Sequence, residues 1–399
     1  MTENITYNRI PTDRYDELHG FIQQSFWPER GTDPSDWPNL DIEDRFGEPY
    51  GLFEDGEIRC SLHRQPFQMR IRGDWHDLRG LSTIVSPPEY RRSGYASRLL
   101  VAEHQATRED GVAFVAAWPF KHSFYANYGW IMTNTFAHME GTPAEFRPKN
   151  PVDAGSFRQL SPDEWSVVDA LYREHAQNSS LSVKRTEHRW RTHMFSPGQT
   201  THYVFVWESD GVERGYVIYH VSDTGTKTIH VRELIASDGE AYRALLTFLS
   251  YHDSQISTVK LPTIDPTGFL NTVVEPSAID ASVHPGPIAR VVDVPRALRE
   301  ISYPADVSGT VRLGVSGLDG QDSERTYELT ISDGSATCGT STDDPELTIG
   351  VDGLTQLVLG SREIDSLVWT GDAVVQSDDV HELLAEAFPA EPVYMHEQF

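Results

Sequence analysis

One stretch of this 399-residue chain, residues 77–110, restricts the possible fold more than any other part. Residues 77–85 predict a β-strand, which ends before the proline pair Pro87-Pro88. Residues 94–110 have the apolar spacing of an amphipathic helix. A strand that leads through a short basic loop directly into a helix is typical of α/β folds, in which helices cover the faces of a sheet.

The loop before this helix has the composition of an anion-binding site. It reads Arg91-Arg92-Ser93-Gly94-Tyr95-Ala96. The first N–H groups of a helix have no partner inside the helix, and the helix dipole favours negative charge near them. The small residues Gly94 and Ala96 would let a diphosphate approach the backbone, and Arg91 and Arg92 would add charge-assisted hydrogen bonds. The alternative is an arginine-rich turn that only opens a surface helix.

Composition and turn residues divide the chain into three segments, 1–150, 151–295 and 296–399. The first has an α/β order of elements, and the third has an α+β order. The second begins at a capping box, Ser161-Pro162-Asp163-Glu164, and repeats the order of the first, which indicates a duplicated fold. The proline-rich residues 285–287 mark its end.

The individual elements are predicted from hydrophobic periodicity and turn residues. The first segment has predicted helices over 12–25, 94–110 and 123–128 and strands over 51–53, 58–64, 77–85 and 112–118. The second has strands over 203–208, 215–221, 228–236 and 257–262 and a helix over 239–251. The third has strands over 310–316, 325–332 and 335–339 and helices over 295–301, 351–359, 362–366 and 377–388.

The basic loop resembles the hallmark of the GCN5-related N-acetyltransferase (GNAT) superfamily, an Arg/Gln-x-x-Gly-x-Gly/Ala sequence that residues 91–96 match. The resemblance implies that acetyl-CoA binds as co-substrate, with its pantetheine arm paired to a splayed strand and its diphosphate in the loop. The implied cofactor-binding residues are Ile84, Val85, Ser86, Arg91, Arg92, Ser93, Gly94, Tyr95 and Ala96.

A second element, residues 119–130, is similar to the superfamily's Phe/Tyr-Tyr-x-x-x-Gly-Phe/Tyr sequence. The resemblance implies that Tyr125 is the general acid that protonates the departing thiolate of coenzyme A. A phenol with a reference pKa near ~10 is protonated at neutral pH and can donate. The alternative for both Tyr125 and Tyr128 is that they are packed aromatic residues.

The three-part layout resembles the Eis (enhanced intracellular survival) acetyltransferases, which have two tandem GNAT-type domains and a sterol-carrier-protein-like domain. In that family the terminal carboxylate of a C-terminal Phe is the general base, which implies this role for Phe399. The alternative is that the terminus frays in solvent. The resemblance also implies a homo-oligomer, often a hexamer, and an amine acceptor such as an aminoglycoside-like polyamine or a lysine side chain.

The second and third segments lack a cofactor site in their sequences. Where the second segment would need a phosphate loop it has Ser237-Asp238-Gly239-Glu240-Ala241, whose acidic side chains would repel diphosphate. We therefore expect it to be structural and to form one wall of the substrate cleft. The third segment has no evident catalytic residues, and we do not predict that it binds lipid.

The formal net charge of −27, with five lysines against 28 arginines, limits the partners. The acidic residues are spread along the whole chain, which fits a surface adapted to concentrated salt better than a local acidic tail for a basic partner. Nucleic-acid binding is not expected. Only Cys60 and Cys338 are present, and no histidine pattern predicts a metal. Without a signal peptide or a membrane-length apolar run, we expect a cytoplasmic protein.

The expected function is therefore direct transfer of an acetyl group to a primary amine. The alternative from another class is a non-catalytic acyl-CoA or lipid-binding sensor that keeps the GNAT scaffold. A third reading is an N-acyltransferase that uses a longer acyl donor.

Overall fold

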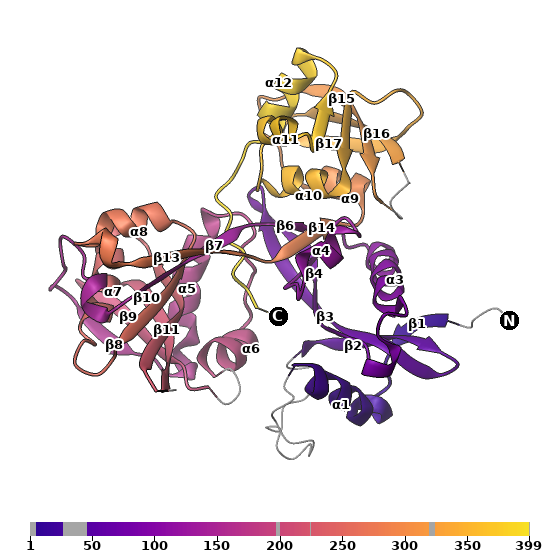
Figure 1. Ribbon diagram of the computed structural model, residues 1–399. Coiled ribbons are helices and arrows are strands. Elements are labelled where there is room, and N and C mark those ends of the chain that lie inside the picture. Colours follow the sequence, from indigo (N-terminus) through magenta and orange to yellow (C-terminus); the bar gives the residue numbers. More distant parts are fainter. Residues whose placement is uncertain (1–4, 27–45, 197–199, 224, 319–323, 399) are drawn as a thin grey trace. The chain divides into compact units, whose positions relative to one another are not determined.

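The computed structural model describes residues 5–26, 46–196, 200–223, 225–318 and 324–398. The chain forms three β-sheets with helices packed against them (Figure 1). It divides into two compact units. Unit 1 contains Met1–Thr133, Ser180–Val183 and Pro287–Phe399, and unit 2 contains Asn134–Ser179 and Lys184–Gly286.

The first sheet belongs to unit 1 and has the strand order β1-β2-β3-β4-β5-β14-β6. Its strands are β1 (Ile5–Arg9), β2 (Glu48–Glu54), β3 (Glu57–Ile71), β4 (Asp74–Val85), β5 (Phe114–Ala117), β14 (Ile288–Val291) and β6 (Ile131–Met132). Its helices are α1 (Tyr15–Phe26), α3 (Tyr95–Glu109) and α4 (His122–Ala126), with 3-10 turns at Thr12–Arg14 and Pro88–Tyr90. The strand–helix–strand order that the sequence predicts is present as β4-α3-β5, in which the two strands pair in parallel.

The second sheet belongs to unit 2 and has the order β13-β7-β12-β11-β10-β9-β8. Its strands are β7 (Thr135–Gly141), β8 (Ser156–Gln159), β9 (Tyr203–Ser209), β10 (Val212–Asp223), β11 (Lys227–Ala236), β12 (Thr258–Thr263) and β13 (Asp280–Pro285). Its helical elements are Pro143–Phe146, Pro162–Glu164, α5 (Trp165–Gln177), α6 (Glu187–Arg189), Trp190–Phe195, α7 (Gly239–Ser250), α8 (Pro266–Thr272) and Pro276–Ala278.

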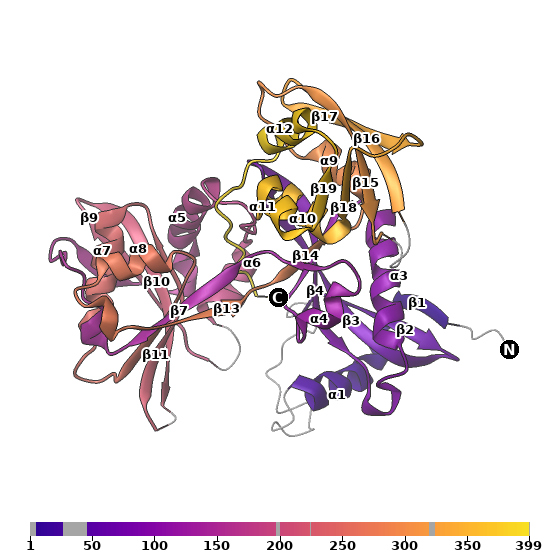
Figure 2. The ribbon, with the colours of Figure 1, turned by 45° about the horizontal axis from the view of Figure 1, so that its top comes forward.

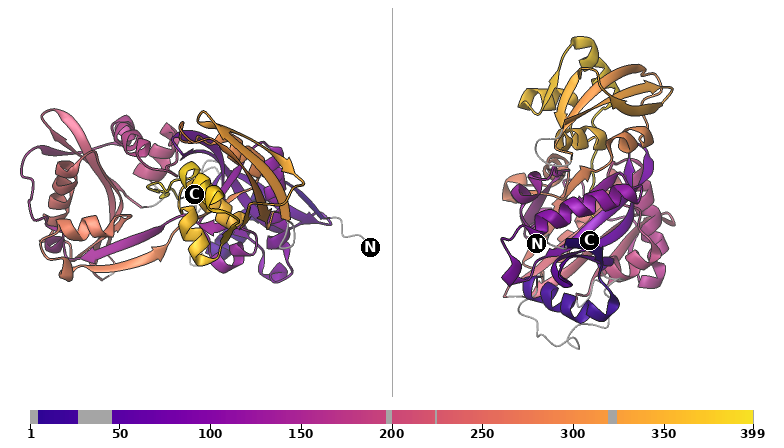
Figure 3. Two further views of the ribbon diagram at one scale, coloured as in Figure 1. Left: turned by 90° about the horizontal axis from the view of Figure 1, so that it is seen from above. Right: turned by 90° about the vertical axis from the view of Figure 1, so that its right-hand side faces the viewer.

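The third sheet, which is also in unit 1, has the order β17-β16-β15-β18-β19. Its strands are β15 (Gly309–Ser316), β16 (Glu324–Ser332), β17 (Ser335–Ser341), β18 (Leu347–Gly350) and β19 (Ala373–Val375). Its helices are α9 (Val294–Glu300), α10 (Val351–Leu359), α11 (Ile364–Thr370) and α12 (Asp378–Ala387). The sheet and its helices are the orange and yellow part of the ribbon, and Figures 2 and 3 show it from other directions.

Two strands are exchanged between the first and second sheets. β7 follows β6 in the chain, but it pairs with β12 and β13. β14 follows β13, but it inserts between β5 and β6. The sheets therefore do not follow the linear segments 1–150 and 151–295, because a strand from each segment completes the sheet of the other. Residues 285–287 are the point at which the chain leaves the second sheet for the first.

One hydrophobic core joins the first sheet to the C-terminal domain. It contains Met69 of β3 and Val291 of β14 together with Leu357 of α10. Arg72, in the turn between β3 and β4, donates from Nη2 to the Leu357 carbonyl at 2.8 Å and from Nε to the Val358 carbonyl at 3.0 Å. These bonds satisfy carbonyl groups at the end of α10, where a helix has no internal donors left.

The described helices include none that is both long and apolar enough to cross a membrane. Within the same residues, no group of three or more His, Cys, Asp or Glu side chains is placed to hold a metal ion.

Candidate active site

The parallel pairing of β4 with β5 ends four residues before β4 does. Their parallel pairing runs from Leu78 opposite Phe114 to Leu81 opposite Ala117. β5 ends there, whereas β4 continues to Val85 and stays paired with β3. Beyond Leu81, the edge of β4 opposite β3 therefore has no strand partner among the described residues. Such an edge can accept an extended ligand through main-chain hydrogen bonds. Ile84 and Val85 lie on it, and Ser86 follows directly.

A β-bulge bends β4 at this point. Thr83 has a φ of 47°, a left-handed conformation that is unusual for a β-branched residue. The pairing of β3 with β4 shifts register between Ser61 and His63, opposite this bend. Bulges twist a strand locally and often lie beside functional sites. The bulge thus turns the end of β4 away from β5 and opens the split.

The loop after β4 leads into α3 through a glycine that the backbone requires. Gly94 is the N-cap of α3 and has a φ of 81°, and no side chain caps the helix there. A Cβ at Gly94 would meet nothing within 4 Å, so the requirement for glycine comes from φ and not from space. α3 therefore begins without a side-chain cap from its N-cap residue.

The two arginines of the loop have different surroundings. Arg91 donates from Nε to the Ser86 carbonyl and from Nη2 to the hydroxyl of Ser25, both at 3.2 Å, so it braces the loop. Arg92 is exposed and has a φ of 63°. Tyr95 donates its hydroxyl to Glu54 at 2.7 Å, so only its backbone N–H can serve an anion. Arg92 is the arginine better placed to meet a ligand.

Tyr125 is a buried residue of α4. It is 1% exposed and belongs to the same buried cluster as Leu81 and Ala117, the last residues that join the two strands. Its ring packs edge-on against Phe124 and Trp130, with ring centres 5.2 and 5.8 Å away. Burial, and to a lesser extent the nearby Cys60 thiol, raises the pKa of Tyr125, so the phenol stays protonated and can act as a proton donor.

Family models match nearly all of the chain. A model described as an acetyltransferase (GNAT) domain matches residues 6–133, and a second model of the same description matches 181–291. A sterol carrier protein domain matches residues 294–396. The chain is an acyltransferase built on GNAT domains. The predicted fold class, two GNAT-type domains followed by a sterol-carrier-protein-like domain, is confirmed.

Curated relatives of this GNAT acyltransferase come from streptomycetes. An uncharacterized N-acetyltransferase of Streptomyces griseus is 27% identical over 355 residues, which is 81% of this chain and 82% of the relative. A second, from Streptomyces avermitilis, is 25% identical over 341 residues, or 80% of this chain and 81% of the relative. Both alignments are longer than any one of the three matched domains.

Solved structures with the same fold cover the full length. A probable N-acyltransferase from Enterococcus faecalis has a TM-score of 0.85 at 19% identity and covers 100% of both chains. A GCN5-related N-acetyltransferase from Anabaena variabilis has a TM-score of 0.84 at 17% identity, over 99% of this chain and 100% of that one. Eis1 from Mycobacterium abscessus has a TM-score of 0.75 at 20% identity, over the same shares.

In the acyltransferase, Tyr128 has a structural contact. Its hydroxyl donates to the Ser97 hydroxyl, which ties the turn after α4 to the first turn of α3. Glu103 also anchors α3. Its buried carboxylate accepts from Arg64 Nε at 2.7 Å and from the hydroxyl of Tyr7. These contacts fix α3 relative to β3 and α4. The Arg64–Glu103 pair has no sequence signal beyond one arginine in a strand.

The C-terminal tail returns to the first domain. The Pro392 carbonyl accepts the N–H of Ser180 at 2.7 Å, and Met395 is fully buried. Trp118, the residue after β5, donates its indole N–H to the Glu397 carbonyl at 2.6 Å, and Glu397 is 3% exposed. The tail is therefore docked as far as Glu397, beside the end of β5. Phe399, the predicted general base, lies outside the described residues.

Sequence reasoning missed a polar patch on the α1 face of the sheet. Ser61 and His63 of β3 are buried, while the intervening Leu62 joins the core on the α3 side. His63 Nδ1 contacts the hydroxyl of Thr83, and burial, with a smaller effect of His19, lowers the pKa of His63 to about 3. The available signal was polar residues at alternate positions of a strand, which indicates a polar face.

The second GNAT domain has no open helix terminus at the equivalent position. Asp238 caps α7 and accepts from the N–H groups of Glu240 and Ala241, both at 2.9 Å. Arg214 Nε binds the same carboxylate at 2.9 Å. The N–H groups that a diphosphate would need already donate to the Asp238 carboxylate. The acidic turn in the sequence therefore contains the cap of α7.

Proposed function

We propose that the first GNAT domain, within residues 1–150, transfers the acetyl group of acetyl-CoA to a primary amine. The observation that carries the proposal is the position of Tyr125, which is buried in the same cluster as Leu81 and Ala117, where β4 and β5 separate. The open edge of β4 would hold the pantetheine arm, and the start of α3 would hold the diphosphate. The remaining loop residues, Ser93, Tyr95 and Ala96, would contribute backbone N–H groups or close approach.

The proposed reaction is a direct transfer. The neutral amine attacks the thioester carbonyl, and the new C–N bond forms as the C–S bond breaks. Tyr125 donates its proton to the departing thiolate, and the Phe399 carboxylate takes the proton that the amine loses. The raised pKa of Tyr125 suits a group that must be protonated at the start of each turnover. No covalent enzyme intermediate is needed.

The acceptor is proposed to be cationic, an aminoglycoside-like polyamine or a lysine side chain. A net charge of −27 favours such molecules over anionic ones. The layout of two GNAT domains and a sterol-carrier-protein-like domain supports an Eis-like enzyme. We further propose a cytoplasmic homo-oligomer of six chains, for which light scattering should report about six times the 45.0 kDa chain mass. A monomeric mass would contradict the assembly.

The deciding experiment compares wild type with Tyr125→Phe, assayed by release of coenzyme A thiol in the presence of polyamine acceptors. Phenylalanine keeps the packing against Phe124 and Trp130 but removes the proton donor. We expect kcat to fall about 100-fold while acetyl-CoA binding, measured by calorimetry, stays unchanged.

The matched control is Tyr128→Phe, which removes a hydroxyl that only ties α4 to α3. Its kcat should stay within about threefold of wild type. Full turnover by Tyr125→Phe would contradict the assigned role. Acetyl-CoA binding without turnover of any amine in wild type would instead favour a non-catalytic acyl-CoA sensor.

The spread of acidic residues supports a second proposal, adaptation to concentrated salt. Repulsion among these charges is screened when the Debye length falls to roughly 3 Å near ~1 M salt. The midpoint of thermal unfolding should therefore rise between about 0.1 M and about 2 M KCl. A midpoint that falls over this range would contradict the proposal.

A further inference from the structure

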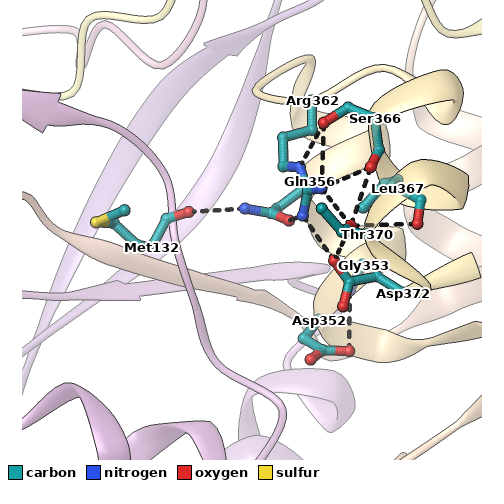
Figure 4. Close-up of polar contacts among 9 residues, drawn as sticks. All are labelled: Met132, Asp352, Gly353, Gln356, Arg362, Ser366, Leu367, Thr370 and Asp372. Carbon is teal, nitrogen blue, oxygen red and sulfur yellow. Dashed lines mark hydrogen bonds and ion pairs between the residues drawn. The ribbon is translucent and has the colours of Figure 1, made fainter.

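One polar cluster outside the proposed active site is closed by its own contacts. In the C-terminal domain, Arg362 Nη1 donates to Gln356 Oε1 at 3.2 Å and to Asp372 at 2.9 Å, and Gln356 Nε2 donates to the Met132 carbonyl at 3.3 Å (Figure 4). These bonds tie α10 to β6 and use the groups that make them. A ligand site needs side chains that the fold leaves available.

A pair of histidines in unit 2 is of the second kind. His138 of β7 and His284 of β13 are both exposed, and their ring centres lie 4.6 Å apart. Among the described residues, neither nitrogen of His138 nor Nδ1 of His284 has a hydrogen-bond partner. Histidine is the commonest metal ligand in proteins, and imidazole suits zinc, copper and nickel ions.

The pairing of β7 with β13 sets the position of the two rings. His138 lies opposite Ser282 and Phe136 lies opposite His284 in the antiparallel register, so the two histidines are diagonal neighbours on one face. The residues before and after His138 are buried in the hydrophobic core of unit 2. Because side chains alternate along a strand, His138 lies on the face of the sheet opposite that core.

The separation of the rings suits two ligands of one metal ion. A metal–nitrogen bond of about 2.1 Å places the ion about 3.3 Å from the centre of an imidazole ring that coordinates in its own plane. Two such ligands at a right angle have ring centres about 4.7 Å apart, as in octahedral or tetragonal coordination. The observed separation is 4.6 Å, and the ring planes are inclined by 46°, so their lone pairs are not parallel and can converge.

A second histidine pair on the same sheet lacks this geometry. The ring centres of His220 on β10 and His230 on β11 are 4.8 Å apart, but the ring planes are only 7° from parallel. In-plane lone pairs of stacked rings run side by side and do not meet at one ion. His230 Nε2 also contacts the hydroxyl of Ser222 at 2.8 Å. The inclination of the rings, more than their distance, distinguishes the two pairs.

Ser282 orients one of the two candidate ligands. Its hydroxyl lies 3.0 Å from Nε2 of His284. With the proton on Nε2, the imidazole donates to Ser282, and Nδ1 carries the lone pair for a metal. A hydrogen bond from the second ring nitrogen is the usual means by which proteins orient a metal-binding histidine.

The charges around the pair favour a cation. Lys260 of β12 forms an ion pair with Glu140 at 2.9 Å, which compensates its charge. Asp280 lies directly opposite Glu140 and adds a second carboxylate on the face that carries the histidines. Burial lowers the pKa of His138, and His284 and Lys260 lower it further. The ring is therefore neutral at neutral pH, which is the form that binds metals.

We propose that His138 and His284 form a binding site for one divalent transition-metal ion of the zinc, copper and nickel class. Within the residues that the structure describes, no third His, Cys, Asp or Glu side chain completes a metal-binding group, so water would fill the remaining coordination positions. Both histidines belong to unit 2, whereas Tyr125 belongs to unit 1, and the proposal does not depend on acetyl transfer.

The test is calorimetric titration of the full chain with ZnCl₂ in a buffer that does not chelate metals. His138→Gln and His284→Gln each remove one ligand and should weaken Zn²⁺ binding at least about tenfold. His230→Gln is the matched control, because it removes a histidine of the same sheet from the stacked pair, and it should bind like wild type. An excess of MgCl₂ should not compete, since Mg²⁺ prefers oxygen ligands.

A loss of Zn²⁺ affinity that is confined to His138→Gln and His284→Gln supports the site. No binding to folded wild type would overturn the proposal, as would equal affinity in these two variants and wild type. An equal loss in His230→Gln would also overturn it, because the metal would then not be held by this pair. Competition by Mg²⁺ would mean that the ions gather at surface carboxylates instead. The titration requires no acetyl transfer, so failure of the proposed function would not change its result.

Discussion

At the scale of single residues, Arg91 and Arg92 of the loop before α3 differ in their contacts, although the sequence alone does not distinguish them. Both side chains are exposed, but Arg91 donates hydrogen bonds to Ser86 and Ser25, which hold its guanidinium group against the protein. A charge-assisted bond to phosphate contributes about 1.5–3 kcal/mol. The larger direct contribution to cofactor binding should therefore come from Arg92.

Arg92→Ala should weaken acetyl-CoA binding about tenfold and leave thermal unfolding unchanged, because an exposed charge is removed. Arg91→Ala should weaken binding and also lower the unfolding midpoint, since the loop loses two hydrogen bonds. Calorimetry and differential scanning fluorimetry measure the two effects. If Arg92→Ala binds like wild type, the diphosphate does not meet this side chain.

At the scale of elements, the proposed site lies where β4 leads into α3. β4 bends at Thr83 and the N-cap of α3 is Gly94, and both residues have a positive φ. The bend separates β4 from β5, and the start of α3 would present N–H groups to the proposed cofactor. Neither element forms a site alone.

Gly94→Ala should destabilise the fold by about 1–2 kcal/mol, because alanine resists a left-handed φ. Gly73, in the turn between β3 and β4, has a φ of 91° and equally open surroundings, so Gly73→Ala is a matched control for this strain. Denaturant unfolding should show similar losses for both variants. Only Gly94→Ala should also weaken acetyl-CoA binding. Equal affinities in the two variants would mean that the start of α3 does not contact the cofactor.

At the scale of the whole molecule, the C-terminal tail docks on residues that are far from it in the sequence. Residues up to Glu397 dock beside Trp118, which lies 279 positions before Glu397 in the sequence. Met395 is buried against the same domain, which opposes fraying of the tail. This docking supports a role for the last residue in the first domain's reaction.

Deleting Phe399 moves the terminal carboxylate back by one residue and should lower kcat about 100-fold at saturating acetyl-CoA. Phe399→Ala keeps a carboxylate at the same chain position and should lose far less activity. Steady-state rates of thiol release compare the two. Equal rates in the deletion variant and wild type would exclude the terminal carboxylate as general base.

Much of the local structure was readable from the sequence, because periodicity and turn chemistry act over short distances. The predicted helix over 351–359 matches α10, and the helix over 94–110 differs from α3 by one residue at each end. The strand over 58–64 was too short, since β3 continues to Ile71 through alternating residues that pack on the C-terminal domain. Local patterns do not record that distant partner.

The sequence by itself determined the order of elements, the basic loop and the tyrosine after β5, because each depends on neighbouring residues. Only the tertiary structure decided which sheet receives β7 and β14, that Arg91 and Arg92 have separate surroundings, and that His63 lies under Thr83. These features depend on contacts between residues far apart in the chain, which hydrophobic burial and long-range strand pairing select together.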